Sequence, residues 1–332
     1  MKHLAASIAM TGALLCSGAA YAQCGDITIA GFSWQSAETL AYVDQFILKN
    51  GYDCNATVIT GDTVPSITSM AEKGQPDIVP EATPSLLPAL VAKALEDGRI
   101  KELGPAVIEG ATSGWYIPKY VADAHPDIKT VPDALKHPDL FPAPEKPGKG
   151  GILMGPQGWG DTVVTAQIFK AFGAEDKGFV IVPTGSAAGL DGAITKAYER
   201  KEGFIAAYWS PTSLLQKYPM VRLDAGVDRD EAEWKRCTTV ADCPDPKPNY
   251  WVPVPMVTLV SDKFATRSDV GPALDYLKKR NWSAGTVGGV MAWMTDNQAS
   301  GADGARHFLK ENQDLWTKWV PADVAEKVKS AL

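Results

Sequence analysis

Histidine is scarce in this chain, and the motifs on which many hydrolases, kinases and metalloenzymes depend are missing. The 332 residues include four histidines, and neither a metal-binding histidine motif nor a G-x-S-x-G nucleophile elbow nor a P-loop occurs. The glycine-rich run 155–160 lacks both the G-x-G-x-x-G spacing and the lysine of a P-loop. We therefore expect no enzymatic activity, and an exported hydrolase is kept only as a remote alternative.

Basic residues are also in the minority. Lysine and arginine number 32 against 39 aspartates and glutamates, which gives a formal net charge of −7. An acidic protein of this kind repels nucleic acid and anionic lipid. Beyond the N-terminus, no stretch is long and apolar enough to cross a membrane. We expect no nucleic-acid partner and no membrane-spanning domain.

The first 22 residues have the pattern of a secretory signal peptide. Lys2 and His3 precede a short apolar run at 4–16, and Ala20-Tyr21-Ala22 is an A-x-A cleavage site. We predict cleavage after Ala22, which leaves 332 − 22 = 310 residues with a formal charge of −7 − 1 = −8. A membrane anchor is the alternative, but no stop-transfer pattern follows.

Neither cysteine near the N-terminus lies in a convincing lipobox. Leu15 precedes Cys16 and Gln23 precedes Cys24, whereas a lipobox has a small residue at that position. We therefore expect a free protein that is exported across a bacterial inner membrane into the periplasm, and not a lipid-anchored one.

Four cysteines remain after cleavage, and an even number in an exported chain indicates disulfides. They are Cys24, Cys54, Cys237 and Cys243. The sequence allows three pairings. We favour Cys24–Cys54, which would join neighbouring strands of one sheet, and Cys237–Cys243, which would close a small hairpin. A zinc site is the weaker alternative, because no C-x-x-C spacing occurs.

Apolar strands alternate with amphipathic helices through most of the chain. Strands are expected at 27–31, 56–60, 77–79, 152–154, 179–183 and 204–208, and helices at about 36–51, 64–73, 85–96, 161–172 and 187–201. We expect Asp161 to cap the fourth of these helices. The alternation indicates parallel sheets that are covered by helices.

The length after cleavage favours two α/β lobes over a single core. We expect lobe I to comprise residues 23–116 and 255–332, because the helical tail from Ser268 returns to it. Lobe II would comprise residues 117–254, with a hairpin insertion at about 228–253. The segment 137–151 is rich in Pro, Gly and Lys, and we expect it to form a surface loop of lobe II.

Four of the ten tryptophans lie in loops flanked by Gly, Ser or Pro. Trp34, Trp159 and Trp209 follow predicted strands, and Trp115 lies near the expected lobe crossover. Ligands bind beyond the carboxyl ends of strands in open parallel sheets. Indole rings that face one cavity can cage a trimethylated nitrogen, which has no N–H to donate and carries its positive charge on its methyl groups. For any single tryptophan, ordinary packing is the alternative.

The other six tryptophans have a more ordinary interpretation. Core packing at the end of a helix accounts for Trp316 and Trp319, and Trp282 and Trp293 lie in or beside a helix. The last two belong to the cysteine hairpin and are Trp234 and Trp251.

Four short motifs follow one another along the chain. They are Pro80-Glu81, Gly158-Trp159-Gly160, Gly185-Ser186-Ala187-Ala188 and Tyr208-Trp209-Ser210-Pro211. In content and order they resemble the glycine betaine-binding family of ABC transporter substrate-binding proteins, over most of the mature chain. The resemblance implies a two-lobed periplasmic binding protein of type II-like fold, with parallel-rich sheets, a hinge and a central cleft. It also implies cage walls at Trp159 and Trp209, and a monomer that delivers its ligand to an ABC transporter permease in the inner membrane.

The chain departs from the family pattern at Thr83, which stands where the family has a further tryptophan. Trp34 and Trp115 are the expected replacement walls. The altered box favours trimethylamine N-oxide, with glycine betaine or choline as alternatives. We expect Glu81 to be the polar partner of the ligand. Its carboxylate would repel the carboxylate of glycine betaine, and the motif loops contain no arginine that could bind such a carboxylate.

Two further ligand roles stay open in the sequence. A sugar-binding protein would also use aromatic rings, but it would need more Asp, Asn and Arg in the same loops. A ligand-binding subunit of a chemoreceptor would share both the fold and the cage.

The hairpin insertion carries six acidic residues and four prolines between Asp228 and Pro253. Oxygen ligands on a stiff loop suit calcium, so Asp242, Asp245 and Asn249 are a candidate structural calcium site. A solvated acidic surface loop is the alternative, since no EF-hand pattern is present. No cofactor is otherwise expected.

Overall fold

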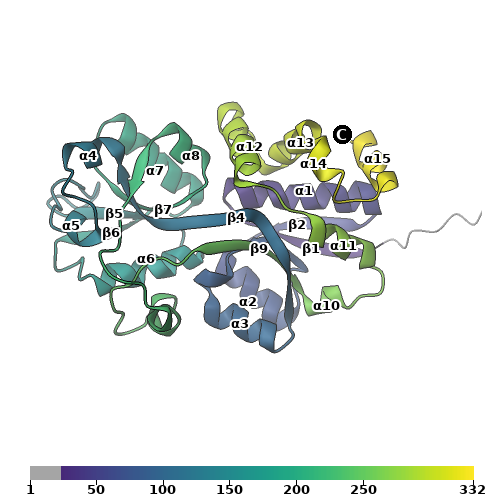
Figure 1. Ribbon diagram of the computed structural model, residues 1–332, viewed down its shortest axis with the longest axis horizontal. Helices are drawn as coiled ribbons and strands as arrows, with labels where there is room; N and C mark the ends of the chain where they lie inside the picture. Colours follow the sequence, from purple (N-terminus) through teal and green to yellow (C-terminus); the bar gives the residue numbers. More distant parts are fainter. Residues whose placement is uncertain (1–23) are drawn as a thin grey trace, which may run out of the picture.

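The computed structural model describes residues 24–332, so the predicted signal peptide and its cleavage site lie outside the described residues. Figure 1 shows two α/β bodies side by side, joined by two long strands that run from one to the other. Within residues 24–332, no helix combines the length and apolar character that a membrane span requires. The predicted fold class, two α/β lobes with parallel-rich sheets, is confirmed.

Lobe I is built on a five-stranded arrangement in the order β2-β1-β3-β9-β4. Its strands are β1 (Asp26–Gly31), β2 (Asn55–Thr60), β3 (Ile78–Ala82), the first part of β4 (Ile100–Pro118) and β9 (Val254–Ser261). β1 pairs in parallel with β2 and β3, whereas β9 is antiparallel to both of its neighbours. Its first helices are α1 (Gln35–Tyr52), α2 (Thr63–Lys73), the 3-10 turn η1 (Pro84–Leu86), α3 (Pro88–Glu96) and α10 (Asp262–Ala265).

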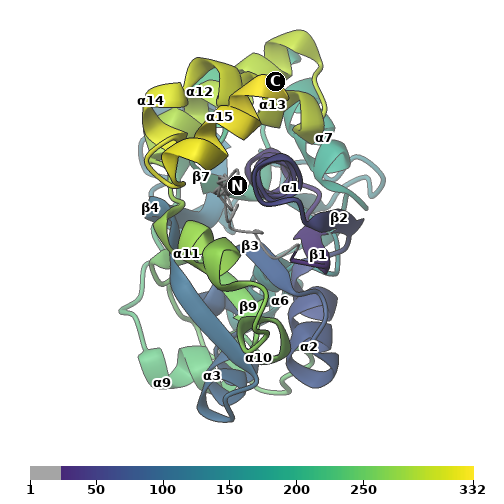
Figure 2. The same ribbon diagram turned by 90° about the vertical axis from the view of Figure 1, so that its right-hand side faces the viewer.

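The helical periodicity of α1 explains its place in this lobe. Leu40, Val43 and Ile47 recur on one helical face, and all three are fully buried. C-terminal helices pack against the same helix, as Figure 2 shows. α11 (Gly271–Lys279), α12 (Ala284–Asn297), α13 (Gly301–Glu311) and α15 (Ala322–Ser330) contact α1, and α14 (Gln313–Trp316) packs against α13. The tail therefore lies on lobe I.

Lobe II contains parallel strands flanked by helices. Its strands are the second part of β4, β5 (Gly150–Met154), β6 (Phe179–Pro183), β7 (Ile205–Ser210) and β8 (Met220–Arg222). Its helices are α4 (Lys119–Ala124), α5 (Val131–Ala134), α6 (Gly160–Ala171), α7 (Ala187–Glu199), α8 (Ser213–Lys217), α9 (Glu231–Glu233) and the π-helical turn η2 (Trp234–Thr238). β5 pairs in parallel with β6 and β7, and β4 is antiparallel to β7 and β8.

One of the two linking strands, β4, pairs with strands of both lobes. Over residues 100–111 β4 pairs with β9 of lobe I, and from Thr112 to Pro118 it pairs with β7 and β8 of lobe II. The predicted lobe boundaries, at 116/117 and 254/255, fall within β4 and at the start of β9. Neither strand is predicted by the local sequence pattern.

Both expected disulfides are confirmed. Cys24–Cys54 joins the residue two before β1 to the residue before β2, with Cα atoms 4.8 Å apart. Cys237–Cys243 closes a short span in the insertion, with Cα atoms 5.5 Å apart. The insertion itself differs from the expected β-hairpin, because α9 and η2 occupy its first part and no strand forms between residues 228 and 253.

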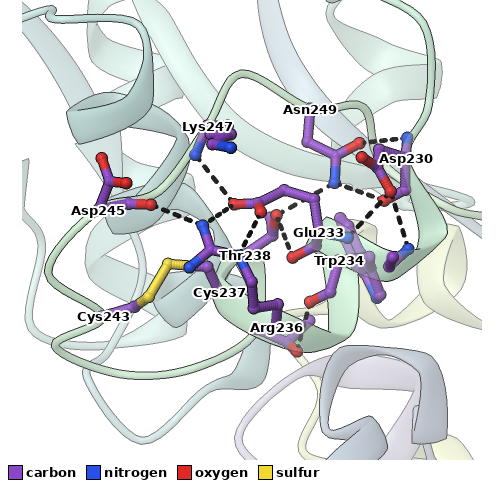
Figure 3. A network of polar contacts seen from close by, with 12 residues as sticks. Asp230, Glu233, Trp234, Arg236, Cys237, Thr238, Cys243, Asp245, Lys247 and Asn249 are labelled. Atoms are coloured by element: carbon purple, nitrogen blue, oxygen red, sulfur yellow. Dashed lines mark hydrogen bonds and ion pairs between the residues drawn. A yellow bond between two sulfur atoms is a disulfide. The ribbon is translucent and has the colours of Figure 1, made fainter.

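The calcium prediction is not supported. Figure 3 shows that Asn249 is already committed within the protein: its amide oxygen accepts from the backbone of Asp230, and its amide nitrogen donates to the Asp230 carbonyl and the Thr238 hydroxyl. Asp245 contributes its backbone carbonyl to Arg236. In the part of the chain that the structure describes, no cluster of three His, Cys, Asp or Glu residues could hold a metal ion.

Candidate ligand-binding site

A cavity lies between the two lobes, at the carboxyl ends of β1 and β3 and beside α6. Its empty volume is about 440 Å³, including the mouth that opens to solvent. Three tryptophans line it, together with the apolar side chains of Leu86, Ala111, Val254 and Met256. Its polar lining consists of Thr63, Thr83, Ser113 and Asp161. The cavity is therefore mostly apolar, with a few polar groups.

The three tryptophans of the cavity meet in space although they are far apart in sequence. Trp34 is the N-cap of α1, Trp159 is the N-cap of α6, and Trp209 lies near the end of β7. The Trp34 and Trp159 ring centroids are 5.6 Å apart at 83°, and those of Trp159 and Trp209 are 5.3 Å apart at 82°. Two rings thus stand nearly perpendicular to the ring between them. Three of the four tryptophans that were predicted as walls therefore line one cavity.

Glu81 lies behind Trp34 and is not among the cavity's lining residues. Its Oε1 atom accepts a hydrogen bond of 2.6 Å from the indole nitrogen of Trp34 and one of 2.8 Å from the Ser36 hydroxyl. The carboxyl is fully buried, and burial raises its pKa, against the opposing effect of these two donors. Glu81 therefore fixes the orientation of the Trp34 ring, whereas the sequence analysis expected it to contact the ligand directly.

Trp115 is placed outside the cavity. It lies on β4 two residues beyond Ser113, on the same side of the strand, but it is fully buried. The ring of Trp251 covers it, with centroids 6.2 Å apart. Trp34 therefore lies with Trp159 and Trp209 at the cavity, whereas Trp115 packs against Trp251 of the insertion.

Asp161 is a lining residue that the sequence analysis assigned to another role. α6 begins at Gly160 with Trp159 as its N-cap and no side-chain cap, so the expected capping by Asp161 is wrong. Its Oδ1 atom instead accepts a hydrogen bond of 3.1 Å from the indole nitrogen of Trp251. Burial raises the pKa of Asp161 to about 6, and hydrogen bonds from Trp251 and Ser113 oppose the rise. Its position directly after the Gly158-Trp159-Gly160 motif is the sequence feature from which its place in the cavity could have been predicted.

The charge of the cavity comes from one side chain. Asp161 is the only lining residue, in the part of the chain described, with an ionisable side chain. Among residues 24–332, no arginine, lysine or histidine lines the cavity to receive a carboxylate. Aromatic walls and one carboxyl group suit a ligand that is cationic at one end and does not bring a free carboxylate.

The two lobes touch on both sides of this cavity. The backbone N–H of Val64 in lobe I donates to the carbonyl of Gly158 in lobe II, at 3.1 Å. The Ser213 hydroxyl of lobe II donates to the Gln35 amide oxygen of lobe I, at 3.0 Å. In this conformation the two lobes therefore contact each other next to the ligand site.

Two lobes, a linking strand and an aromatic cavity between them define a solute-binding protein. Residues 25–311 match the model of the family described as the substrate-binding domain of ABC-type glycine betaine transport systems. The chain belongs to this family, whose members are solute-binding proteins and not enzymes. A comparison with curated proteins found no match.

Solved structures show the same fold at low sequence identity. The glycine betaine/L-proline-binding protein ProX of Borrelia burgdorferi superposes with a TM-score of 0.71 at 18% identity, covering 91% of this chain and 99% of that one. A choline-binding protein in complex with choline gives 0.70 at 18%, covering 93% and 98%. Lactococcal OpuAC, closed on glycine betaine, gives 0.67 at 18%, covering 90% and 100%.

Proposed function

We propose that this protein is the periplasmic substrate-binding component of an ABC importer and that it captures a small trimethylated amine, with trimethylamine N-oxide favoured over glycine betaine and choline. The observation that carries the proposal is the convergence of Trp34, Trp159 and Trp209 on one cavity without a facing cation. The relatives named above bind glycine betaine or choline, which supports the ligand class.

The aromatic walls provide enough interaction energy for capture. A trimethylated nitrogen cannot be held by hydrogen bonds, so the negative faces of the indole rings must bind its methyl groups. Each desolvated contact of this kind contributes about 2 kcal/mol. Three such contacts, less the cost of ordering the ligand and closing the lobes, suffice for a Kd of roughly micromolar order.

The polar lining favours the N-oxide among the candidate ligands. Glycine betaine would bring a carboxylate toward Asp161, and no arginine is present to offset the repulsion. Trimethylamine N-oxide brings a single oxygen, which can share a proton with a carboxyl group. Choline brings a hydroxyl donor and stays the nearer alternative.

Closure of the lobes provides the signal for delivery. Ligand that bridges the tryptophans of lobe II and Trp34 of lobe I stabilises the closed form, and the permease would recognise that form. We propose that the protein acts as a monomer in the periplasm, after cleavage of the signal peptide.

The proposal is tested by calorimetry with trimethylamine N-oxide, glycine betaine, choline and carnitine. Trp159→Ala and Trp209→Ala should each weaken binding of the tightest ligand at least tenfold. Trp316→Ala is the matched control, because this tryptophan is fully buried in the C-terminal helices and its indole nitrogen bonds the Leu309 carbonyl. It should lower the melting temperature with little change in affinity. Wild-type affinity in both cavity variants would refute the proposal, as would the absence of binding to all four ligands.

A further inference from the structure

The carboxyl group of Asp161 is held in place from two elements of lobe II. The Trp251 indole, from the disulfide-bridged insertion, donates to its Oδ1 atom. The Ser113 hydroxyl, from β4, is its second donor, and Ser113 also lines the cavity. These contacts fix the carboxyl at the cavity wall beside Trp159, although they leave it capacity for another hydrogen bond.

The charged and titratable groups on the neighbouring strands form hydrogen bonds with partners other than Asp161. Arg222 of β8 donates to the Ser113 carbonyl at 3.2 Å and to the Tyr250 hydroxyl. Tyr116 of β4 lies in the field of both Arg222 and Asp161, and its hydroxyl bonds the Thr112 carbonyl. Within residues 24–332, no lysine, arginine or histidine forms an ion pair with Asp161. A negative charge there is therefore left for the ligand to compensate.

We propose that Asp161 determines the specificity of the site, and that its carboxyl group shares one proton with the oxygen of trimethylamine N-oxide and disfavours trimethylated ligands that end in a carboxylate. This inference rests on the proposed function and names its ligand. The proton balance is simple. When Asp161 is ionised in the free protein, binding takes up one proton from solvent, and that proton lies between the carboxylate and the N-oxide oxygen in the complex. When Asp161 is already protonated, no proton is taken up.

The chemistry of the ligands separates them. The N-oxide oxygen carries a localised negative charge and is a stronger base than the carboxylate of glycine betaine, which the neighbouring ammonium group acidifies. It therefore forms the stronger hydrogen bond with a protonated carboxyl. Choline carries a net positive charge and brings a hydroxyl donor, so it favours the ionised form of Asp161. The raised pKa of Asp161 places the change between these two forms in an accessible pH range.

Calorimetry on the wild-type protein at two pH values tests this directly. From about pH 5.5 to about pH 7.5, affinity for trimethylamine N-oxide should fall on the order of 20-fold, as expected for uptake of one proton by a group with a pKa near 6. Affinity for choline should instead rise over the same range. Titrations in buffers of different ionisation enthalpy should give close to one proton taken up per N-oxide bound at the higher pH.

The variant Asp161→Asn keeps an acceptor for Trp251 and adds an amide donor for the ligand. Its affinity for trimethylamine N-oxide should not depend on pH, and it should bind glycine betaine at least tenfold more tightly than wild type at about pH 7.5. Glu81→Gln is the matched control, because it replaces the buried carboxyl behind Trp34, outside the cavity lining, and should leave the pH dependence in place.

Two results would overturn the inference while leaving the proposed function intact. One is a pH-independent affinity for trimethylamine N-oxide in the wild-type protein. The other is the same ranking of ligands in Asp161→Asn and wild type, provided that Trp159→Ala and Trp209→Ala still lose binding. Wild-type affinity in both Trp159→Ala and Trp209→Ala would instead refute the proposed function.

Discussion

The indole nitrogen of Trp234 in lobe II donates a hydrogen bond of 2.7 Å to the backbone carbonyl of Ser85 in lobe I. Trp234 belongs to the insertion that the Cys237–Cys243 disulfide closes, and its side chain is almost completely buried. The insertion is attached to α6, because Gln167 and Lys170 donate to its backbone carbonyls. Since Ser85 adjoins Leu86, a cavity residue, this bond joins the lobes next to the ligand site.

We predict that Trp234→Phe shortens the lifetime of the ligand complex. The ring and most of the packing are retained, but the bond between the lobes is lost. A net hydrogen bond of about 1 kcal/mol corresponds to roughly fivefold faster dissociation. Stopped-flow fluorescence measures this rate. Trp293→Phe is the control, because Trp293 stacks on His307 within the C-terminal helices, and it should dissociate at the wild-type rate. Equal rates in both variants would show that the bond does not stabilise closure.

Glu81→Gln should weaken binding of all trimethylated ligands by a similar factor. Its carboxyl group orients Trp34 through the 2.6 Å hydrogen bond, and an amide in its place has one acceptor oxygen instead of two. We expect a uniform loss of about threefold to tenfold, which corresponds to roughly 1 kcal/mol. Calorimetry with three ligands measures it. A loss confined to one ligand would mean that Glu81 contacts that ligand directly.

The Cys24–Cys54 disulfide should matter for stability and not for binding. It closes a span of 30 positions far from the cavity, and the chain-entropy model gives about 3–4 kcal/mol for such a loop. The double variant Cys24→Ser, Cys54→Ser should lose this much free energy of unfolding in urea and keep its affinity for ligand. A matching loss of affinity would indicate that strand β1 transmits strain to Trp34.

The sequence predicts those parts of the fold in which one periodicity runs undisturbed. α1 repeats its apolar residues over 18 residues, and β5 and β6 are short apolar runs between turns. β4 could not be recognised, because register shifts between Glu102 and Ala111 break the alternation of a 19-residue strand. Its length arises from pairing with different partners in the two lobes, which is a tertiary effect.

The candidate site follows the same division. Trp159 and Trp209 lie in motifs that the sequence displays, and Trp34 follows the first strand, so their convergence could be anticipated from strand order. Trp115 has the same local signature, but a distant residue, Trp251, covers it. In the sequence Asp161 resembles a helix cap, but in the folded protein it accepts a hydrogen bond from Trp251. Contacts with Trp251 of the insertion determine where Trp115 and Asp161 lie, and these contacts cannot be predicted from the local sequence.

The last prediction concerns the dependence of stability on pH. Burial raises the pKa of Asp161 to about 6 in the folded protein, whereas an unfolded aspartate titrates near 3.9. Because the folded-state pKa is the higher one, the folded state binds more protons between these values. The contribution of Asp161 to stability is therefore fully present below about pH 4 and is lost as the pH rises through about 6. At neutral pH its ionised form costs up to roughly 2–3 kcal/mol.

Asp161→Asn removes this cost, because the amide does not ionise and still accepts from Trp251. Without ligand, the variant should match the wild type in urea unfolding at about pH 4 and exceed it by up to roughly 2–3 kcal/mol at about pH 7.5. Other buried acids, including Asp44 and Glu81, also have raised pKa values, so the difference between the two proteins is the quantity to compare. Asp275→Asn, at an exposed residue of α11, serves as a comparison for substitution alone. A wild type that is the more stable of the two at both pH values would show that Asp161 is stabilised as a carboxylate, and the assignment of its raised pKa would then fail.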